Sequence, residues 1–154
     1  MGIGDLLSRQ AVGVRATAPN KRQLLHGRAD LAAPALGVPA EAVFEGLLER
    51  EALGSTGLGG GVAVPHARLP GLTRVTGVFI KLDQPVAFEA VDDLPVDLVF
   101  GLFAPADAGA DHLRALAAVS RLLRRADVRD RLRQARSADS LYAMLTGEVQ
   151  AFAA

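Results

Sequence analysis

One stretch of the sequence organises the rest: residues 54–69 read GSTGLGGGVAVPHARL. Five of its first eight residues are glycine, so the backbone there can adopt positive φ and let other groups approach closely. Short apolar residues then lead to Pro65, which has no amide hydrogen and is expected to end a strand. The sequence therefore predicts that His66 lies at a strand end, beside a glycine-rich loop.

His66 is the candidate nucleophile, and our hypothesis is that it accepts a phosphoryl group. Neutral imidazole is a competent nucleophile near neutral pH, and a hydrogen bond to one ring nitrogen orients the other. The hydroxyls of Ser55 and Thr56, and loop amides such as that of Gly57, are the donors that an oxyanion needs. The competing interpretation is an ordinary loop or core histidine, which is the default for a lone histidine after a strand.

The glycine-rich loop does not match a nucleotide-binding motif. It lacks the Gly-Lys-Ser/Thr ending of a P-loop, and it precedes a strand where a dinucleotide fingerprint would precede a helix. We exclude both nucleotide sites. A structural hairpin or bulge is the alternative to anion binding.

Two arginines are candidate phosphate contacts. Arg50 could chelate phosphate oxygens with its guanidinium fork, although its neighbours Glu49 and Glu51 could equally neutralise it at a helix end. Arg68, two residues beyond His66, is a second possible contact to phosphate or to a partner.

His112 follows Asp111 at the predicted start of a helix, where free amides and the helix dipole attract phosphate. It matters for this chemistry only if the fold brings it to His66, and a surface histidine is the alternative. Three histidines so widely separated do not have the spacing of metal ligands, so we expect neither a metal nor a cofactor.

Composition narrows the class of protein further. The 17 basic and 17 acidic residues balance, so no net charge indicates nucleic acid or a membrane surface as a partner. The chain has no cysteine, which excludes disulfides and thiolate chemistry. No apolar run approaches the roughly 20 residues of a spanning helix and no signal peptide is evident, so we expect a cytoplasmic protein without membrane insertion.

The arginines of residues 121–136 form the densest charge cluster. Aspartates interrupt them, and helical spacing spreads them around the helix axes. We interpret the cluster as a solvated face, with nucleic-acid binding as a minor alternative.

The pattern of elements predicts one α/β domain covering residues 1–154. Apolar periodicity and caps indicate helices first and last, with strands between them. The expected helices cover residues 3–9, 21–35, 40–52, 111–126, 127–135 and 138–146, capped in part by Asn20, Asp111 and Ser137. The expected strands cover residues 11–14, 62–65, 74–82 and 96–104, with a turn at 83–85, a short pairing segment at 86–88 and a core built mainly from Ala, Leu and Val.

The stretch that ends at His66 strongly resembles the active-site motif of phosphotransferase-system enzyme IIA of the fructose/mannitol class, and within that class the nitrogen-regulatory branch. The resemblance extends from about residue 5 to residue 147, with its segments in the family's order. Supporting segments are residues 44–51, 75–79, 85–88, 95–98, 105–107, 112–113 and 137–142.

The resemblance implies a mixed β-sheet of about five strands flanked by helices on both faces. It also implies that His66 accepts a phosphoryl group on Nε2 from an HPr-like phosphohistidine carrier, with His112 as the second active-site histidine and Arg50 beside them. Such a protein is a phosphohistidine carrier rather than an enzyme that turns over a small molecule. Its further partners would be regulatory target proteins or a IIB protein.

The sequence departs from the family pattern in two places. Many relatives have Gly-Lys after the active histidine, whereas this chain has Ala67 and Arg68, which keep the charge but narrow the backbone's freedom. Arg114 stands where some relatives have a further histidine.

Three functions remain open from the sequence. The first is a nitrogen-regulatory phosphoryl carrier that controls targets through the charge state of His66. The second is a transport component that passes phosphate to a separate fructose- or mannitol-type IIB protein. The third is a non-catalytic interaction module with the same fold.

Overall fold

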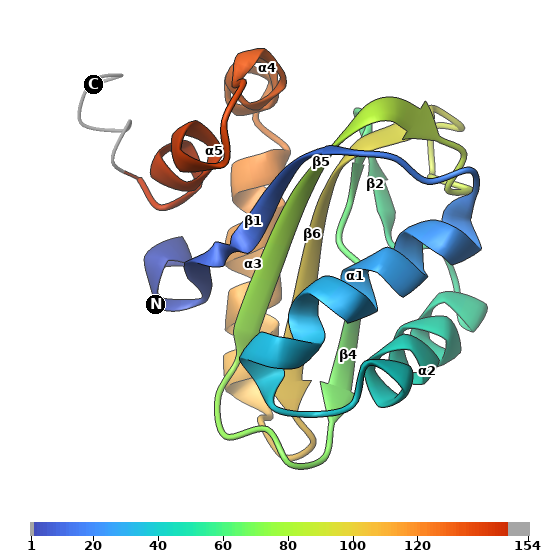
Figure 1. The fold of residues 1–154 in the computed structure, drawn as a ribbon, viewed down its shortest axis with the longest axis vertical. Helices are drawn as coiled ribbons and strands as arrows, with labels where there is room; N and C mark the ends of the chain where they lie inside the picture. Colours follow the sequence, from blue (N-terminus) through green and yellow to red (C-terminus); the bar gives the residue numbers. More distant parts are fainter. Residues whose placement is uncertain (1, 148–154) are drawn as a thin grey trace.

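The computed structural model describes residues 2–147 as three layers, with a sheet between two sets of helices (Figure 1). The helices are the 3-10 helix η1 (Ile3–Asp5), α1 (Lys21–Leu36), α2 (Ala40–Ala52), α3 (Ala110–Leu123), α4 (Ala126–Gln134) and α5 (Ala138–Leu145). The strands are β1 (Leu7–Ala16), β2 (Gly57–Gly59), β3 (Val62–Ala63), β4 (His66–Leu69), β5 (Thr76–Val86) and β6 (Val96–Pro105). In Figure 1, α1 and α2 cover the front of the sheet and α3 lies behind it.

The mixed sheet flanked by helices is confirmed, with six strands. Their order is β1-β5-β6-β3-β2, and β4 also pairs with β6. The central β5 and β6 are antiparallel, whereas β1 runs parallel to β5, and β3 and β4 run parallel to β6. Strand β6 is buried along nearly its whole length, as its apolar run predicts.

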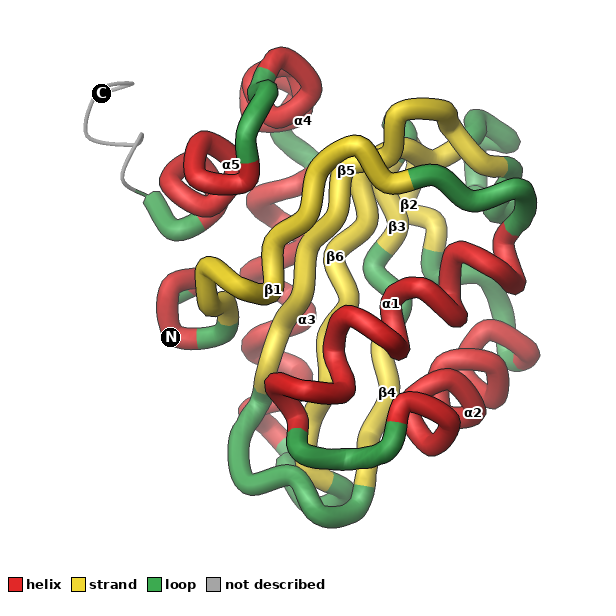
Figure 2. The backbone as a smooth tube through the Cα atoms, viewed as in Figure 1, coloured by secondary structure: helices red, strands yellow, loops and turns green. Residues whose placement is uncertain are grey.

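Pro65 divides the stretch before the histidine into two short strands. β3 ends at Ala63, and β4 begins at His66, so His66 opens a strand rather than following one. Both strands lie along the same edge of β6, where Figure 2 shows them joined by a short loop. The Pro65 carbonyl accepts a hydrogen bond from the Leu102 amide at 2.9 Å, which keeps the break in register with the sheet.

Two of the three N-caps that the sequence predicts are confirmed. The Asn20 side chain accepts from the Gln23 amide at 2.8 Å at the start of α1. Ser137 does the same for Ser140 at 3.1 Å at the start of α5. The expected cap at Asp111 was wrong, because the N-cap of α3 is Gly109 and Asp111 lies in the first turn, where a negative charge suits the helix dipole.

Two local expectations fail because distant strand pairing overrides the local pattern. The helix expected over residues 3–9 is a single 3-10 turn followed by β1, whose Leu7 lies opposite Gly77 of β5. The turn expected at residues 83–85 lies inside β5, with an irregular register between Lys81 and Val86. Of the pairing segment expected at 86–88, Val86 pairs with Val96.

The core lies between the sheet and both helical layers and consists mainly of Ala, Leu and Val, as predicted. Its largest fully buried side chains include Phe79, Phe88, Phe100 and Phe103. Within residues 2–147, no helix combines the length and apolar character that crossing a bilayer requires.

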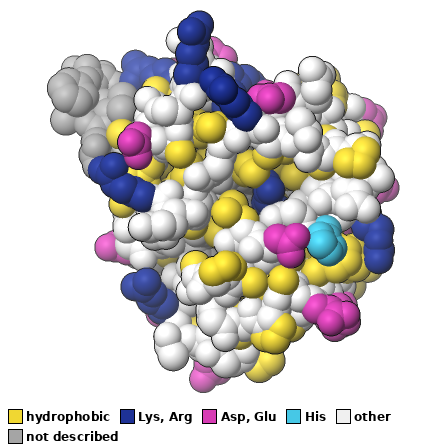
Figure 3. Space-filling view, viewed as in Figure 1, with side chains coloured by type: hydrophobic (Ala, Val, Ile, Leu, Met, Phe, Trp, Pro, Cys, Tyr) yellow, Lys and Arg dark blue, Asp and Glu magenta, His cyan; other side chains and the backbone are white. Residues whose placement is uncertain are grey.

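The arginine cluster is only partly a solvated face. Figure 3 shows Lys and Arg side chains gathered over α4, but two arginines of this helix bond to buried or neighbouring backbone. Arg133 donates to the Gly60 carbonyl at 2.6 Å and forms a double contact with Asp97, while Arg129 donates to the Leu123 carbonyl at 3.1 Å. These two arginines were interpreted wrongly from the sequence: Arg133 bonds to Asp97 and to the glycine loop, which are distant along the chain, and Arg129 bonds to the end of the preceding helix.

Candidate functional site

His66 is held in one tautomer by its own strand connection. Its Nδ1 lies 2.8 Å from the Val64 carbonyl, an acceptor, so Nδ1 carries the proton. Nε2 is therefore the nitrogen with a free electron pair, and it accepts a hydrogen bond from Arg50 Nε at 3.1 Å. The arrangement presents an oriented nucleophilic nitrogen beside a fixed cation.

The pKa of His66 favours the same neutral form. Burial lowers it below its ordinary value, and Arg50 lowers it further, whereas the Val64 carbonyl and Glu51 oppose the shift. A neutral imidazole keeps its electron pair available for attack at neutral pH.

Arg50 comes from the last turn of α2 and reaches both the histidine and the glycine loop. Besides its bond to His66, its Nη1 donates to the Gly54 carbonyl at 2.9 Å. The carboxylate of Glu51 is engaged instead by Lys21 at 3.0 Å and by Thr56. The cation of Arg50 is thus directed to His66 rather than to the neighbouring Glu51.

His112 of α3 lies directly against His66. The two ring centroids are 5.5 Å apart, and the rings are tilted by 58°. Only 5% of His112 is exposed, and its Nδ1 has no hydrogen-bond partner among the described residues. Burial lowers the pKa of His112, and His66 and Arg68 add to the shift.

A cavity of about 320 Å³ opens over these side chains. Arg68 lies on its wall with an exposed side chain, and Leu53 on its rim is 85% exposed. The lining residues are Gly46, Glu49, Arg50, Leu53, His66, Ala67, Arg68 and His112. The fold therefore brings together Arg50 from α2, His66 and Arg68 from β4, and His112 from α3.

Ser55, Thr56 and Gly57 belong to the glycine-rich loop, and their hydrogen bonds are made to other protein groups. Ser55 donates its hydroxyl to the Phe88 carbonyl at 2.7 Å and accepts from the Gly57 amide at 3.1 Å. Thr56 is 5% exposed and donates both its amide and its hydroxyl to Glu51. Their hydrogen bonds hold the loop against α2 and the segment before β6.

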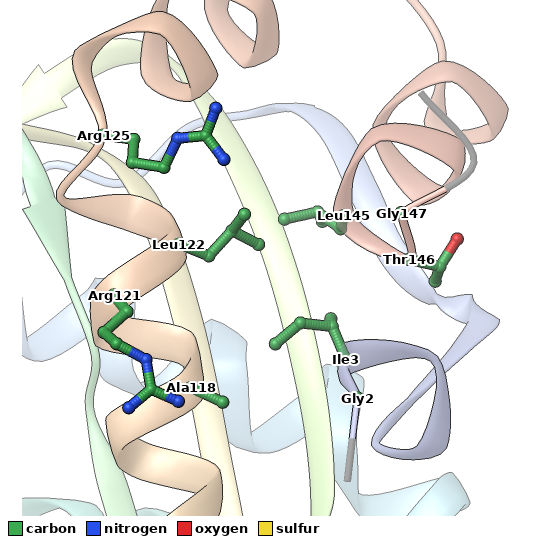
Figure 4. Close-up of a pocket in the computed structure, with 9 residues that line it drawn as sticks. All are labelled: Gly2, Ile3, Ala118, Arg121, Leu122, Arg125, Leu145, Thr146 and Gly147. Carbon is green, nitrogen blue, oxygen red and sulfur yellow. The ribbon is translucent and has the colours of Figure 1, made fainter. Parts of the chain in front are cut away.

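A second cavity, of about 330 Å³, lies between η1, α3 and α5 (Figure 4). Arg121 and Arg125 line it together with Ile3, Leu122 and Leu145, and its lining includes no histidine. In residues 2–147, no three His, Cys, Asp or Glu side chains are grouped to hold a metal ion.

Comparison with known proteins identifies the family. The family model described as "Phosphoenolpyruvate-dependent sugar phosphotransferase system, EIIA 2" matches residues 5–147. The chain belongs to this family.

Two nitrogen regulatory proteins and one solved structure are similar to this EIIA over most of their length. A nitrogen regulatory protein of Bradyrhizobium diazoefficiens is 48% identical over 145 residues, covering 94% of this chain and 95% of the relative. A nitrogen regulatory protein of Escherichia coli K12 is 41% identical, covering 94% of this chain and 89% of the relative. The crystal structure of nitrogen regulatory protein IIA-Ntr from Neisseria meningitidis matches with a TM-score of 0.89 at 36% identity, covering 94% of this chain and 99% of that one.

Sequence reasoning missed two groups that contribute to this EIIA site. The Val64 carbonyl fixes the tautomer of His66, and backbone atoms leave no signal in sequence. Lys21 comes from the start of α1, far from the motif, and reaches Glu51 at 3.0 Å. Its only signal was a basic residue at the start of the first long helix.

Proposed function

We propose that this EIIA is a nitrogen-regulatory phosphoryl carrier that accepts a phosphoryl group on Nε2 of His66. One observation carries the proposal: Nδ1 is bound to the Val64 carbonyl, while Nε2 meets Arg50 at the wall of an open cavity. A nucleophile needs this combination of fixed tautomer, low pKa and access.

The proposed step exchanges one phosphorus–nitrogen bond for another. Nε2 of His66 bonds to phosphorus as the bond from phosphorus to the donor's histidine breaks, and the departing imidazole takes the electron pair. The positive charge that develops on the His66 ring is stabilised through the hydrogen bond from Nδ1 to the Val64 carbonyl. Little further covalent chemistry is required of the protein.

The other site residues would stabilise the phosphoryl oxygens. Arg50 would move its donor from Nε2 to an oxygen of the transferred group, since Nε2 gives up its electron pair. The imidazole of His112 and the guanidinium of Arg68, which both line the cavity, would contact other oxygens. Ser55, Thr56 and Gly57 would act as the frame that holds the loop and Arg50 in place.

The partners follow from this chemistry and from the relatives. The donor would be an HPr-like phosphohistidine carrier, and the whole chain would act in the cytoplasm as a single domain with a core of about residues 5–147. Relatives that are 41% and 48% identical are nitrogen regulatory proteins, which favours regulatory targets over a IIB protein. Phosphorylation would add roughly two negative charges next to exposed Leu53, enough to make or break a docking surface.

The test is phosphorylation by enzyme I, an HPr-type carrier and phosphoenolpyruvate, followed by intact mass. We expect a single phosphate that is lost in acid, complete loss of labelling in His66→Ala, and normal labelling in His26→Ala, whose histidine is on the exposed side of α1. Labelling of His66→Ala, or none of the native protein, would contradict the proposal. Rapid onward transfer to a fructose- or mannitol-type IIB protein would instead favour the transport function.

A further inference from the structure

A buried carboxylate stands next to the cation of the site. Glu51 follows Arg50 on α2, and only 5% of its side chain is exposed. Its Oε1 lies 3.1 Å from the Thr56 amide and 3.0 Å from Lys21 Nζ, and its Oε2 accepts from the Thr56 hydroxyl. Both carboxylate oxygens therefore have partners, as a buried charge requires.

Lys21 is the counter-charge that makes this burial possible. Its side chain is 18% exposed, lies 4.5 Å from the centroid of the Phe88 ring, and reaches Glu89 at 3.5 Å as well as Glu51. Because Glu89 is 83% exposed, the pair between Lys21 and Glu51 is the more shielded one. Lys21 thus ties the start of α1 to the end of α2.

Arg50 and Glu51, which are consecutive in α2, form hydrogen bonds with the residues before and after Ser55. Arg50 donates to the Gly54 carbonyl at 2.9 Å, and Glu51 accepts from the Thr56 amide at 3.1 Å. The Glu51 carboxylate therefore restricts the movement of the loop, and Arg50 is hydrogen-bonded to that same loop through Gly54. Arg50 in turn contacts His66 Nε2 at 3.1 Å.

We propose that Glu51, clamped by Lys21 and Thr56, is a positioning residue for phosphoryl transfer at His66. This inference rests on the function proposed above and adds residues to its mechanism. Glu51 holds Thr56, and with it the loop to which Arg50 bonds, in a fixed position, while Lys21 supplies its counter-charge. The clamp does not touch the transferred group, because its carboxylate is saturated by Lys21 and Thr56.

The charge of Glu51 acts on His66 within a defined set of groups. Those that line the His66 cavity or act on its charge are Glu49, Arg50 and Glu51 from α2, Arg68 from β4 and His112 from α3. Lys21 and Glu89 face the Glu51 side of the network. Glu51 raises the pKa of His66, in opposition to burial and to Arg50.

Two substitutions should move His66 in opposite directions. In Glu51→Gln, loss of the negative charge lowers the pKa of His66 further, whereas in Lys21→Gln the unshielded carboxylate raises it. A role limited to folding would not produce opposite shifts. The control is Glu45→Gln, which removes an exposed carboxylate of the same helix and should leave the pKa unchanged.

The experiment combines an NMR pH titration of the His66 ring with phosphorylation kinetics over a range of carrier concentrations. For Glu51→Gln we expect the maximal rate to fall about 10- to 100-fold through misplacement of Arg50, with an unchanged carrier concentration at half-maximal rate. Glu45→Gln should match the native protein in both measurements.

The outcomes separate the two proposals. A native rate and an unmoved His66 pKa in Glu51→Gln would overturn the positioning role while leaving the carrier function intact. Shifts of the same sign in Glu51→Gln and Lys21→Gln would also overturn it. If the native protein accepts no phosphate, the carrier function fails, and this positioning role fails with it.

Discussion

The two halves of residues 54–69 look alike as candidate anion-binding sequence, but their polar atoms are used differently. In the first half, the Gly60 amide already donates to Asp92 at 2.9 Å, and the Gly60 carbonyl accepts from Arg133 at 2.6 Å. In the second half, His66 and Arg68 line an open cavity with His112. Gly60 and Gly61 allow the arginines of α4 to approach the backbone closely, whereas the residues of this stretch that line the cavity follow Pro65.

The crowding around the glycines supports this difference. A Cβ on Gly60 would lie 2.9 Å from the guanidinium carbon of Arg129, and one on Gly61 would collide with the guanidinium of Arg133. Both glycines also have positive φ, of 67° and 80°. This part of the loop is therefore packed tightly against the arginines of α4 rather than being an open cradle.

The largest expected effect is at the cavity, in Arg50→Met. Removing the donor nearest Nε2 should lower the maximal rate of phosphoryl acceptance about 100- to 1,000-fold, as for other preorganised donors at a reacting group. Quenched time courses of phosphorylation, analysed by intact mass, would measure this rate. Arg131→Met, which removes an exposed arginine of α4, is the control and should keep the native rate; a native rate in Arg50→Met would remove Arg50 from the mechanism.

The next effect is at the glycine loop and concerns stability. Gly61→Ala should lower the free energy of unfolding by about 2 kcal/mol or more, because it combines positive φ with a collision. Gly37→Ala is the matched control: its φ of 71° is similar, but the site has open space, so the loss should be about 1 kcal/mol. Urea unfolding measures both.

The comparison of the two halves would be contradicted by equal losses in Gly61→Ala and Gly37→Ala. Neither Gly60 nor Gly61 lines the cavity, so loss of phosphoryl acceptance by the folded fraction of Gly61→Ala would also contradict the comparison.

The smallest expected effect is the pH dependence of stability. The pKa values of His66 and His112 are lowered in the folded state, chiefly by burial, so the unfolded chain binds protons first as pH falls below about 6.5. The free energy of unfolding should therefore decrease between pH 7.5 and the lowered pKa values. A His66→Gln, His112→Gln double variant should show a flatter dependence over the same range, measured by urea unfolding; an equally steep one would assign the effect to other groups.

Local signals were sufficient for the helices from α1 onward and for β6. Asn20 and Ser137 cap their helices as predicted, and the apolar run of residues 96–104 is the buried β6. Pairing with distant strands decided the rest: β1 begins at Leu7 because it meets β5, and the 83–85 segment stays in β5. Such pairings depend on the whole fold and leave little local pattern.

The site was predictable only in part. His66 was indicated by its position after Pro65, and the meeting of His66 with His112 followed from the family resemblance alone, since 46 residues separate them. The Lys21 partner of Glu51 and the Arg133 contact with Gly60 were not predictable, because each joins side chains or backbone from distant parts of the chain.

The most direct test of the central claim is to identify the atom that carries the phosphate. We would phosphorylate protein labelled with ¹⁵N in its histidines and measure the coupling between phosphorus and each ring nitrogen of His66. The geometry predicts phosphate on Nε2, with Nδ1 still protonated and bound to the Val64 carbonyl. Phosphate on Nδ1, or on a histidine other than His66, would contradict the account.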